Sequence, residues 1–359
     1  MERSEGVKMN NWKRLMMIVF CIGLATVIIG CKKDEKNESS NKGKENNTSE
    51  KGTPSTGIYP FTGIETDEGI DNRPLAVMIN NHNAARPHSG IVDADIVFEI
   101  LAEGDITRFL AIFQSEIPDT VGSVRSAREY YFELAQGYDA VYVYHGAANF
   151  VNDMINSQNI EHLNGAVYDN DQHLFKRDSA RKAPHNSYVL LENAYEVAEQ
   201  KGYDITADVT PFEFVEKDTS IAGEDAQTVE IGYNGQNPAH LVSFTYDEQS
   251  NNYARSEDGT ETKDLITDTP IEVENIFIIE TAHRVFDSEG RREVDLTSGG
   301  NGYLVQQGVI QEVEWENQDG QLLPVKDGQV VPFVQGKTWV NIIPTDPGLQ
   351  SSVRFFGNE

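Results

Sequence analysis

The chain has 359 residues and a formal net charge of -29, with 29 Lys and Arg against 58 Asp and Glu. Such a surface disfavours nucleic acids and anionic lipid headgroups as partners, because both carry dense negative charge. Both cysteines lie within the first 31 residues. The chain beyond residue 31 therefore has no disulfide, no thiolate metal site and no cysteine nucleophile.

The first thirty residues have the pattern of a secretory signal peptide. Four basic residues precede an apolar run over residues 15–29, and a glycine follows just before Cys31. A cysteine directly after the expected cut resembles a bacterial lipobox, so Cys31 would carry the lipid. A transmembrane anchor is the alternative, but about 15 apolar residues are short for a bilayer that needs roughly 20. Translation could start at Met1 or at Met9.

The segment after the signal is expected to be a tether. Residues 32–57 contain no aromatic and no large apolar side chain, so they cannot bury enough surface to fold. Loss of residues 1–30, with four Lys or Arg and two Asp or Glu, changes the formal charge to -31. Acyl chains rather than charge would then hold the protein on the membrane. We expect a signal peptide at 1–30, a disordered tether at 31–57, and a lipid-anchored protein on the extracytoplasmic face of the cell membrane.

Strand and helix signals alternate over residues 58–205. Two continuous apolar runs, residues 73–80 and 139–144, are typical of strands buried on both faces. The stretch that begins at Ala94 predicts an antiparallel hairpin around residues 103–105. We expect an α+β or α/β N-terminal domain with a mixed sheet. Helical periodicity predicts helices over residues 126–136, 149–158 and 187–202.

The second half of the chain, residues 206–359, is expected to form a mainly β domain, either a small barrel or a sandwich. Short stretches alternate apolar and polar residues between Gly, Asn and Asp turns. Residues 302–315 have the pattern of a hairpin. No repeat of fixed period is present. The predicted strands lie at residues 228–233, 241–246, 271–280, 302–308, 309–315 and 337–344.

Several blocks of sequence, in the same order, resemble one known family. They are RPLAVMINNHNAARPHSGIVDADIVFEILAEGDITRFLAIF, VGSVRSAREYYFELAQGYDAVYVYHG, RKAPHNSY and GKTWVNIIP. Together they resemble the YerB-like lipoprotein family of Gram-positive bacteria, over residues 73–344. The resemblance implies a two-part domain of unknown function and a place in the cell envelope, but no reaction. The chain departs from the family after Tyr144, where a His-Ala-Gly-Gly-like turn is replaced by HGAA.

Arginine and histidine are concentrated in the N-terminal domain. Residues 58–200 contain seven arginines but only two lysines, and six of the eight histidines. Solubility does not require arginine over lysine, whereas bidentate recognition of carboxylate or phosphate does. The alternative is that these arginines pair with the many internal carboxylates.

The basic residues fall where strands end and helices begin. His145 follows a predicted strand, and Arg181 and His185 precede a predicted helix. In an α/β sheet these positions share one edge, where ligands usually bind. The sequence thus predicts a ligand-binding set at this edge. Its members at the edge are Arg125, Arg128, His145, Arg181 and His185. Arg86, Arg108 and Glu103 are further candidate ligand-binding residues.

Two of these arginines stand near a predicted helix start. Ser126 and Glu129 have capping-box spacing, which would make Ser126 the N-cap and place Arg128 in the first turn. Cations there oppose the macrodipole by about 0.3–1 kcal/mol each, so helix stability does not explain them. We hypothesise an anion site, with a salt bridge to Glu99 or Glu103 as the alternative.

No recognised catalytic motif is present, and no catalytic residue, metal site or cofactor is predicted. The acidic turns at Asp169 and Asp287 do not match an EF-hand loop. We expect a non-catalytic module that binds an anionic cell-envelope ligand or a protein partner, and no nucleic acid. The alternative is a cell-wall hydrolase that pairs Glu103 with His145 or His185 as acid and base.

Overall fold

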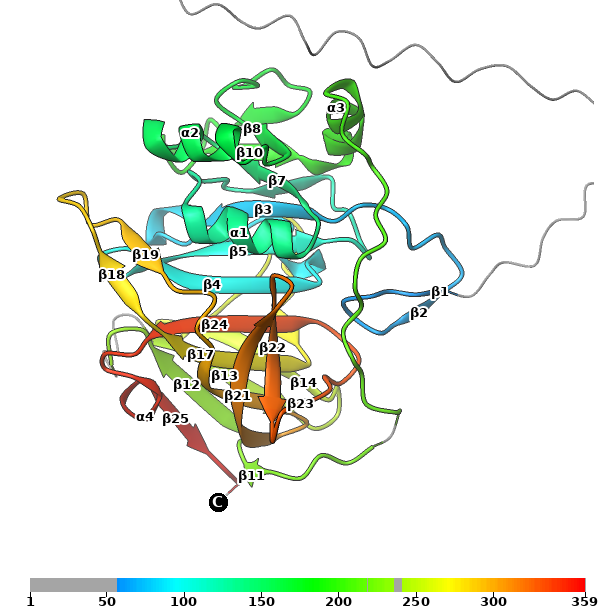
Figure 1. Cartoon of the computed structure of the whole chain (residues 1–359), viewed down its shortest axis with the longest axis vertical. Helices are drawn as coiled ribbons and strands as arrows, with labels where there is room; N and C mark the ends of the chain where they lie inside the picture. Colours follow the sequence, from blue (N-terminus) through cyan, green and yellow to red (C-terminus); the bar gives the residue numbers. More distant parts are fainter. Residues whose placement is uncertain (1–56, 218, 236–240, 359) are drawn as a thin grey trace, which may run out of the picture. The chain divides into compact units, whose positions relative to one another are not determined.

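A mixed sheet of twelve strands forms the centre of the fold (Figure 1). The computed structural model describes residues 57–217, 219–235 and 241–358. The predicted lipid site at Cys31 and residues 32–56 lie outside the described residues. Eleven strands follow one path across the sheet, and β11 (Glu224–Asp225) pairs with β21 beside it. The path runs β23 (Gln329–Val330), β22 (Gln321–Lys326), β21 (Val309–Gln318), β20 (Gly300–Gln306), β17 (Asn275–Thr281), β24 (Thr338–Pro344), β4 (Ile96–Glu103), β5 (Ile106–Phe113), β3 (Leu75–Asn80), β7 (Val141–Tyr144) and β8 (His162–Asn164).

The strands predicted for the N-terminal half are confirmed. Every residue of β3 and β7 is buried, as their unbroken apolar runs predict. β4 and β5 form the predicted antiparallel hairpin. β3, β7 and β8 are parallel neighbours, so their carboxyl ends meet at one edge of the sheet.

The strands of the C-terminal half extend this same sheet rather than closing a barrel of their own. β24 lies between β17 and β4 and runs parallel to both. All seven of its residues are buried, so it is a central strand and not the half-exposed strand that alternation predicts. β20 and β21 form the predicted hairpin on the far side of β17.

Two smaller sheets, of six and of three strands, cover one face of the main sheet. Successive side chains of a strand point to opposite faces, so Leu75, Val77 and Ile79 of β3 share one face. They pack in a core with Val229 and Phe244 of a six-stranded sheet. That sheet consists of β15 (Thr260–Glu261), β14 (Asn252–Glu257), β13 (Leu241–Asp247), β12 (Thr228–Gly232), β25 (Val353–Phe356) and β16 (Glu272–Val273). The other small sheets are β6 (Thr120–Gly122) with β10 (Ser187–Leu190) and β9 (Phe175–Arg177), β1 (Gly57–Ile58) with β2 (Glu65–Thr66), and β18 (His283–Val285) with β19 (Arg292–Val294).

Two helices pack on the opposite face. α1 (Glu129–Gly137) and α2 (Asn149–Ser157) share the second core with Ala76 and Met78 of β3. α3 (Ala194–Gln200) and the four-residue α4 (Leu349–Ser352) belong to the first core. The described part of the chain also contains three short 3-10 turns, at Asn83–Ala85, Ile91–Asp93 and Leu191–Asn193. No helix of the described residues is long and apolar enough to span a bilayer.

Two predicted helix starts are wrong. Helix α1 begins at Glu129 with Arg128 as its N-cap, and Ser126 does not cap it. Residues 125–128 lie outside the helix. The Ala127 N–H donates to the Gly146 carbonyl instead, and the Ser126 carbonyl accepts from Arg108. The helix predicted from Ser187 begins only at Ala194. Pairing with β6 and β9 makes residues 187–190 a strand, so tertiary contacts override local helical periodicity.

Candidate functional site

The segment from Gly122 to Arg128 crosses the carboxyl ends of β3 and β7. The Asn80 N–H donates to the Ser123 carbonyl, and the Arg125 N–H donates to Met78. The His145 N–H in turn donates to the Arg125 carbonyl. These main-chain bonds fix Arg125 beside the residues that follow both strands, as the edge argument predicts.

Arg125 carries a charge that no carboxylate neutralises. Its side chain is half-buried and forms no ion pair or hydrogen bond with any residue that the structure describes. Burial, together with the nearby charge of Arg108, lowers the pKa of Arg125 to about 10. The guanidinium therefore remains charged at neutral pH. All five of its N–H donors are available to a ligand.

His145 lies next to Arg125, but both of its ring nitrogens already have partners. Nδ1 is 2.7 Å from Ser187 Oγ, and Nε2 is 3.0 Å from Arg177 Nη2. Since a guanidinium only donates, Nε2 accepts and Nδ1 carries the hydrogen. Burial and the charge of Arg177 lower the pKa of His145. The ring also rests against Gly165, where an added Cβ would come within 2.5 Å of Nδ1.

His185 and His82 stack on each other close to Arg125. Their ring centroids are 4.7 Å apart with an interplanar angle of 28°. Burial and the charges of His82, Arg125 and Arg181 lower the pKa of His185. His82 lies two residues after the end of β3, and His145 lies directly after β7. This similar position at a strand end could have indicated His82 as a site residue from the sequence.

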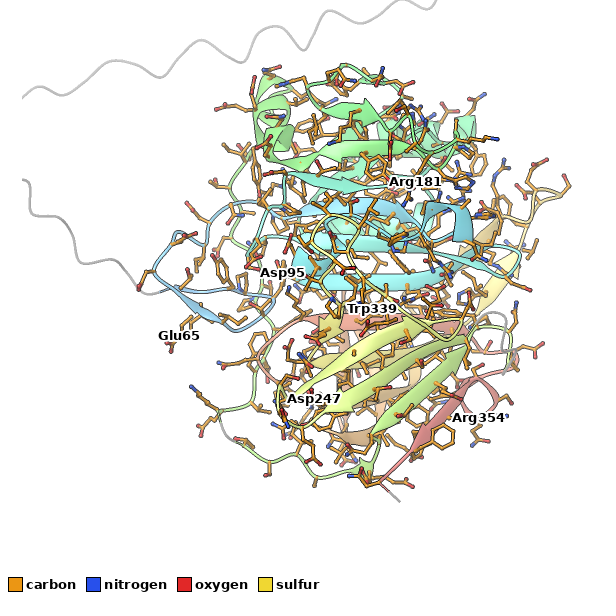
Figure 2. The ribbon with its side chains drawn as sticks, turned by 180° about the vertical axis from the view of Figure 1, so that it is seen from behind. Glu65, Asp95, Arg181, Asp247, Trp339 and Arg354 are labelled. Carbon is orange, nitrogen blue, oxygen red and sulfur yellow. The ribbon has the colours of Figure 1, made fainter. Side chains whose placement is uncertain are left out.

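Arg181 and Arg177 complete the basic cluster, which we define as Arg125, His145, His185, His82, Arg177 and Arg181. Arg181 donates to the main-chain carbonyls of Ala85 and Pro87 and pairs with no carboxylate among the described residues. Arg177 donates to Asp169 at 2.6 Å, so its charge is partly neutralised. Figure 2 shows Arg181 in the upper half of the view and Arg354, on β25, in the lower half.

Three predicted site residues form a separate ion-pair cluster beside it. Glu103 accepts from Arg108 through one oxygen, at 2.6 Å, and from Arg128 through the other. Arg128 also donates to the Ala127 carbonyl. The alternative role of a salt bridge therefore describes Arg128, but not Arg125. No hydrogen bond or ion pair of the described residues joins Glu103 to His145 or His185, so the structure does not assemble the acid–base pair expected of a hydrolase.

Arg86 lies in a buried network of charges between β4 and the six-stranded sheet. It pairs with Glu257 and Asp258. Glu257 also accepts from Arg255, which reaches Glu99 at 3.0 Å. Arg255 and Glu99 have no exposed side-chain surface. Arg86 is thus neutralised by internal carboxylates, although its neighbours Ala85 and Pro87 accept hydrogen bonds from Arg181.

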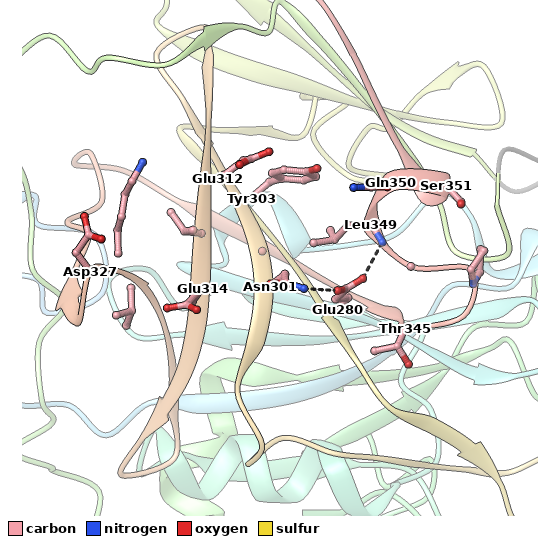
Figure 3. A pocket seen from close by; sticks show the side chains of 16 residues that line it. Glu280, Asn301, Tyr303, Glu312, Glu314, Asp327, Thr345, Leu349, Gln350 and Ser351 are labelled. Carbon is pink, nitrogen blue, oxygen red and sulfur yellow. Dashed lines mark hydrogen bonds between the residues drawn. The ribbon is translucent and has the colours of Figure 1, made fainter.

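A hollow of about 720 Å³ lies elsewhere on the described surface (Figure 3). It opens over β17, β20, β21 and β22. Glu280 is held there by Asn301 Nδ2 at 2.7 Å and by the Leu349 N–H at 2.8 Å. Because Glu312 and Glu314 add further carboxylates, this hollow would repel an anion. Among the described residues, no three His, Cys, Asp or Glu side chains lie close enough together to hold a metal ion.

Comparison with known proteins identifies the family. Residues 61–204 match the model described as "Protein of unknown function (DUF3048) N-terminal domain", and residues 229–340 match its C-terminal domain. The chain belongs to the DUF3048 family. The family is thus divided into two domains, of which the second is mostly β here, and the resemblance drawn from the sequence blocks is confirmed.

A sequence comparison and a structure comparison, both with YerB of Bacillus subtilis, support this assignment. A protein of Bacillus subtilis (strain 168) named "Putative lipoprotein YerB" is 45% identical over 286 residues, which cover 79% of this chain and 86% of that protein. The crystal structure of YerB from Bacillus subtilis aligns with a TM-score of 0.75 and 43% identity. It covers 83% of this chain and 99% of the YerB chain. The DUF3048 fold described above is therefore shared with an experimentally determined relative.

Proposed function

We propose that this chain is a lipoprotein, anchored through Cys31 to the extracytoplasmic face of the cell membrane, whose N-terminal domain binds an anionic ligand of the cell envelope. The relative YerB is named as a lipoprotein, and residues 1–31 have the lipobox pattern. Residues 31–57 would act as the tether. We place the binding domain at 58–205 and a mainly β domain at 206–359.

The observation that carries the binding proposal is the unpaired charge of Arg125. The chain has twice as many acidic as basic residues, so an internal carboxylate would be easy to supply. The neighbouring Arg128 has one, in Glu103. Leaving a half-buried cation without a counterion costs folding free energy, whereas an anionic ligand would recover that energy on binding.

A hydrolytic role fits this geometry less well. The contact between His145 and Ser187 resembles a base and a nucleophile, but Nδ1 of His145 carries the hydrogen and donates to Ser187 Oγ. A general base would instead have to accept the serine proton. Ser187 is also buried. We therefore favour binding over catalysis.

Replacing Arg125 should weaken binding without unfolding the protein. We expect Arg125→Ala to lower affinity for a purified acidic cell-wall polymer by about 10- to 100-fold, since a charge-assisted hydrogen bond contributes roughly 1.5–3 kcal/mol. Isothermal titration calorimetry on the full-length chain in detergent measures this. The free energy of unfolding, measured in urea, should not fall by more than about 0.5 kcal/mol, because Arg125 has no partner to lose.

The matched control is Arg354→Ala, which removes the same charge from an exposed position on β25 (Figure 2). Its affinity should equal that of wild type. Equal losses in both variants would mean that binding follows overall charge, and the site would then be rejected. An unchanged affinity of Arg125→Ala would place the ligand elsewhere.

The anchor can be tested separately through Cys31. We expect Cys31→Ser to abolish lipid attachment, so that the protein remains an uncleaved precursor or is shed into the medium. Cell fractionation followed by immunoblotting distinguishes these outcomes from wild type. Normal processing and membrane retention of the variant would exclude Cys31 as the anchor.

A further inference from the structure

We propose that the anion bound by the basic cluster is a phosphoryl group, as a phosphomonoester or phosphodiester, held between the guanidinium of Arg125 and the Nε2–H groups of His82 and His185. The inference rests on the proposed function and names its ligand class. Three observations support it: the tautomers of the two imidazole rings, the position of the donors on three separate segments, and the positive charges that have no carboxylate partner.

The hydrogen bonds fix the tautomers of both stacked rings. The Ala84 N–H donates to His82 Nδ1 at 3.0 Å, so Nδ1 accepts and the hydrogen lies on Nε2. The amide of Asn80 lies 2.8 Å from His185 Nδ1. Its oxygen already accepts from the His82 N–H, so its nitrogen faces His185 and donates. His185 therefore also carries its hydrogen on Nε2.

Both Nε2–H groups are available to a ligand. Neither has a hydrogen-bond partner among the residues that the structure describes. Both rings are only partly buried. Arg125, close enough for its charge to lower the pKa of His185, adds five further donors.

These donors come from three separate segments of the chain. His82 stands in the loop after β3, Arg125 in the segment before α1, and His185 in the loop before β10. A carboxylate offers two oxygens whose lone pairs all lie in one plane. A phosphoryl group places its oxygens tetrahedrally and can accept from a guanidinium and from imidazoles in other directions. The arrangement therefore favours phosphoryl over carboxylate.

The charge balance points the same way. Arg125 and Arg181 leave two positive charges without a carboxylate partner in the described part of the chain. A phosphomonoester carries about -1.5 to -2 at neutral pH, and a phosphodiester polymer presents successive single charges. Either would neutralise the cluster more fully than one carboxylate.

Binding of such an anion should draw a proton onto Nδ1 of His185, at the cost of the hydrogen bond that this nitrogen accepts from Asn80. The charged and titratable groups around this ring are His82, Arg125 and Arg181, and no carboxylate forms an ion pair with it among the described residues. Burial and these cations lower its pKa in the free protein. A bound anion offsets the cations and raises that pKa. Affinity should therefore increase as the pH falls from about 8 to about 5.5, because the bound state holds the proton more tightly.

The test is calorimetric titration of the full-length chain in detergent with four soluble probes. Glycerol phosphate represents a monoester, bis(glyceryl) phosphate a diester, and lactate and succinate represent carboxylates. We expect the phosphoryl compounds to bind at least tenfold more tightly than the carboxylates. The pH series uses the diester, because a monoester titrates near pH 6 itself. Vesicles with and without phosphatidylglycerol then separate a lipid headgroup from a soluble polymer as the source.

His185→Gln provides the decisive variant, since its side-chain amide can still donate a hydrogen bond but cannot titrate. It should keep affinity within about tenfold at pH 8 and lose the increase at lower pH. Arg354→Ala should retain that increase. Equal or tighter binding of the carboxylates, with Arg125→Ala still impaired in polymer binding, would overturn the phosphoryl inference and leave the proposed function intact. If Arg125→Ala binds the acidic polymer normally, the proposed function itself fails.

Discussion

Arg255→Met is expected to destabilise the fold by about 3–5 kcal/mol, because removing one partner of a buried ion pair leaves an uncompensated charge. The Arg255 side chain is fully buried and reaches both Glu99 and Glu257 at 3.0 Å. Its guanidinium also lies 4.7 Å from the ring centre of Trp339 and 5.3 Å from that of Phe109. Methionine fills similar volume but neutralises neither carboxylate. Urea unfolding followed by tryptophan fluorescence measures the loss.

The loss should depend on pH in a defined direction. Burial raises the pKa of the Glu257 carboxyl, with Arg255 opposing the shift. A carboxyl whose folded-state pKa is raised contributes stability that is fully present below its unfolded value of 4.5 and is lost as pH rises through the folded value. Without Arg255 that pKa rises further. The variant should therefore be least stable relative to wild type near pH 8, and the difference should shrink toward pH 5.

Two further variants make this prediction specific. Arg354→Met removes an exposed arginine from the same six-stranded sheet and should change stability by less than about 0.5 kcal/mol. Adding Glu99→Gln to Arg255→Met should recover part of the loss, since it removes one of the stranded carboxylates. A loss below about 1 kcal/mol in Arg255→Met, or no recovery in the double variant, would show that the network contributes little.

A chain cleaved at a protease site inserted after Asp208 should remain one particle. Asp208 is exposed, and the cut separates the two family domains. β24 of the second fragment nevertheless pairs with β4 of the first, from Thr338 opposite Ile96 to Ile342 opposite Ile100. Gel filtration should elute both fragments together in native buffer and apart in denaturant.

The N-terminal fragment alone should lack a cooperative unfolding transition. Its isolation would expose Phe98 and Ile100, and would expose Trp339 and Ile342 of the other fragment, all of which are fully buried in the intact chain. Each such side chain contributes roughly 1.5–3 kcal/mol when buried. Together they approach the total stability of about 5–15 kcal/mol of a typical domain. If each fragment unfolds cooperatively by itself, the domains are independent and the shared sheet is not required.

The local elements of this fold could be predicted from the sequence where a pattern is strong and short. The unbroken apolar runs at residues 73–80 and 139–144 gave fully buried strands, because a strand covered on both faces needs no polar positions. The hairpin around Gly104 followed from turn chemistry. Residues 187–190 were predicted helical and are a strand, because β6 and β9 offer partners that local periodicity does not reveal.

The candidate site, too, could be predicted only in part from the sequence. The sequence by itself determined that arginine and histidine gather in the N-terminal half, and that Arg125, His145 and His185 stand near strand and helix ends. Only the tertiary structure decided that Glu103 neutralises Arg128 but leaves Arg125 unpaired, and that β24 enters the middle of the N-terminal sheet. The physical reason is the separation along the sequence between the residues that interact. Periodicity and turn chemistry act between residues a few positions apart, whereas ion pairs and strand order depend on partners that are distant in the sequence.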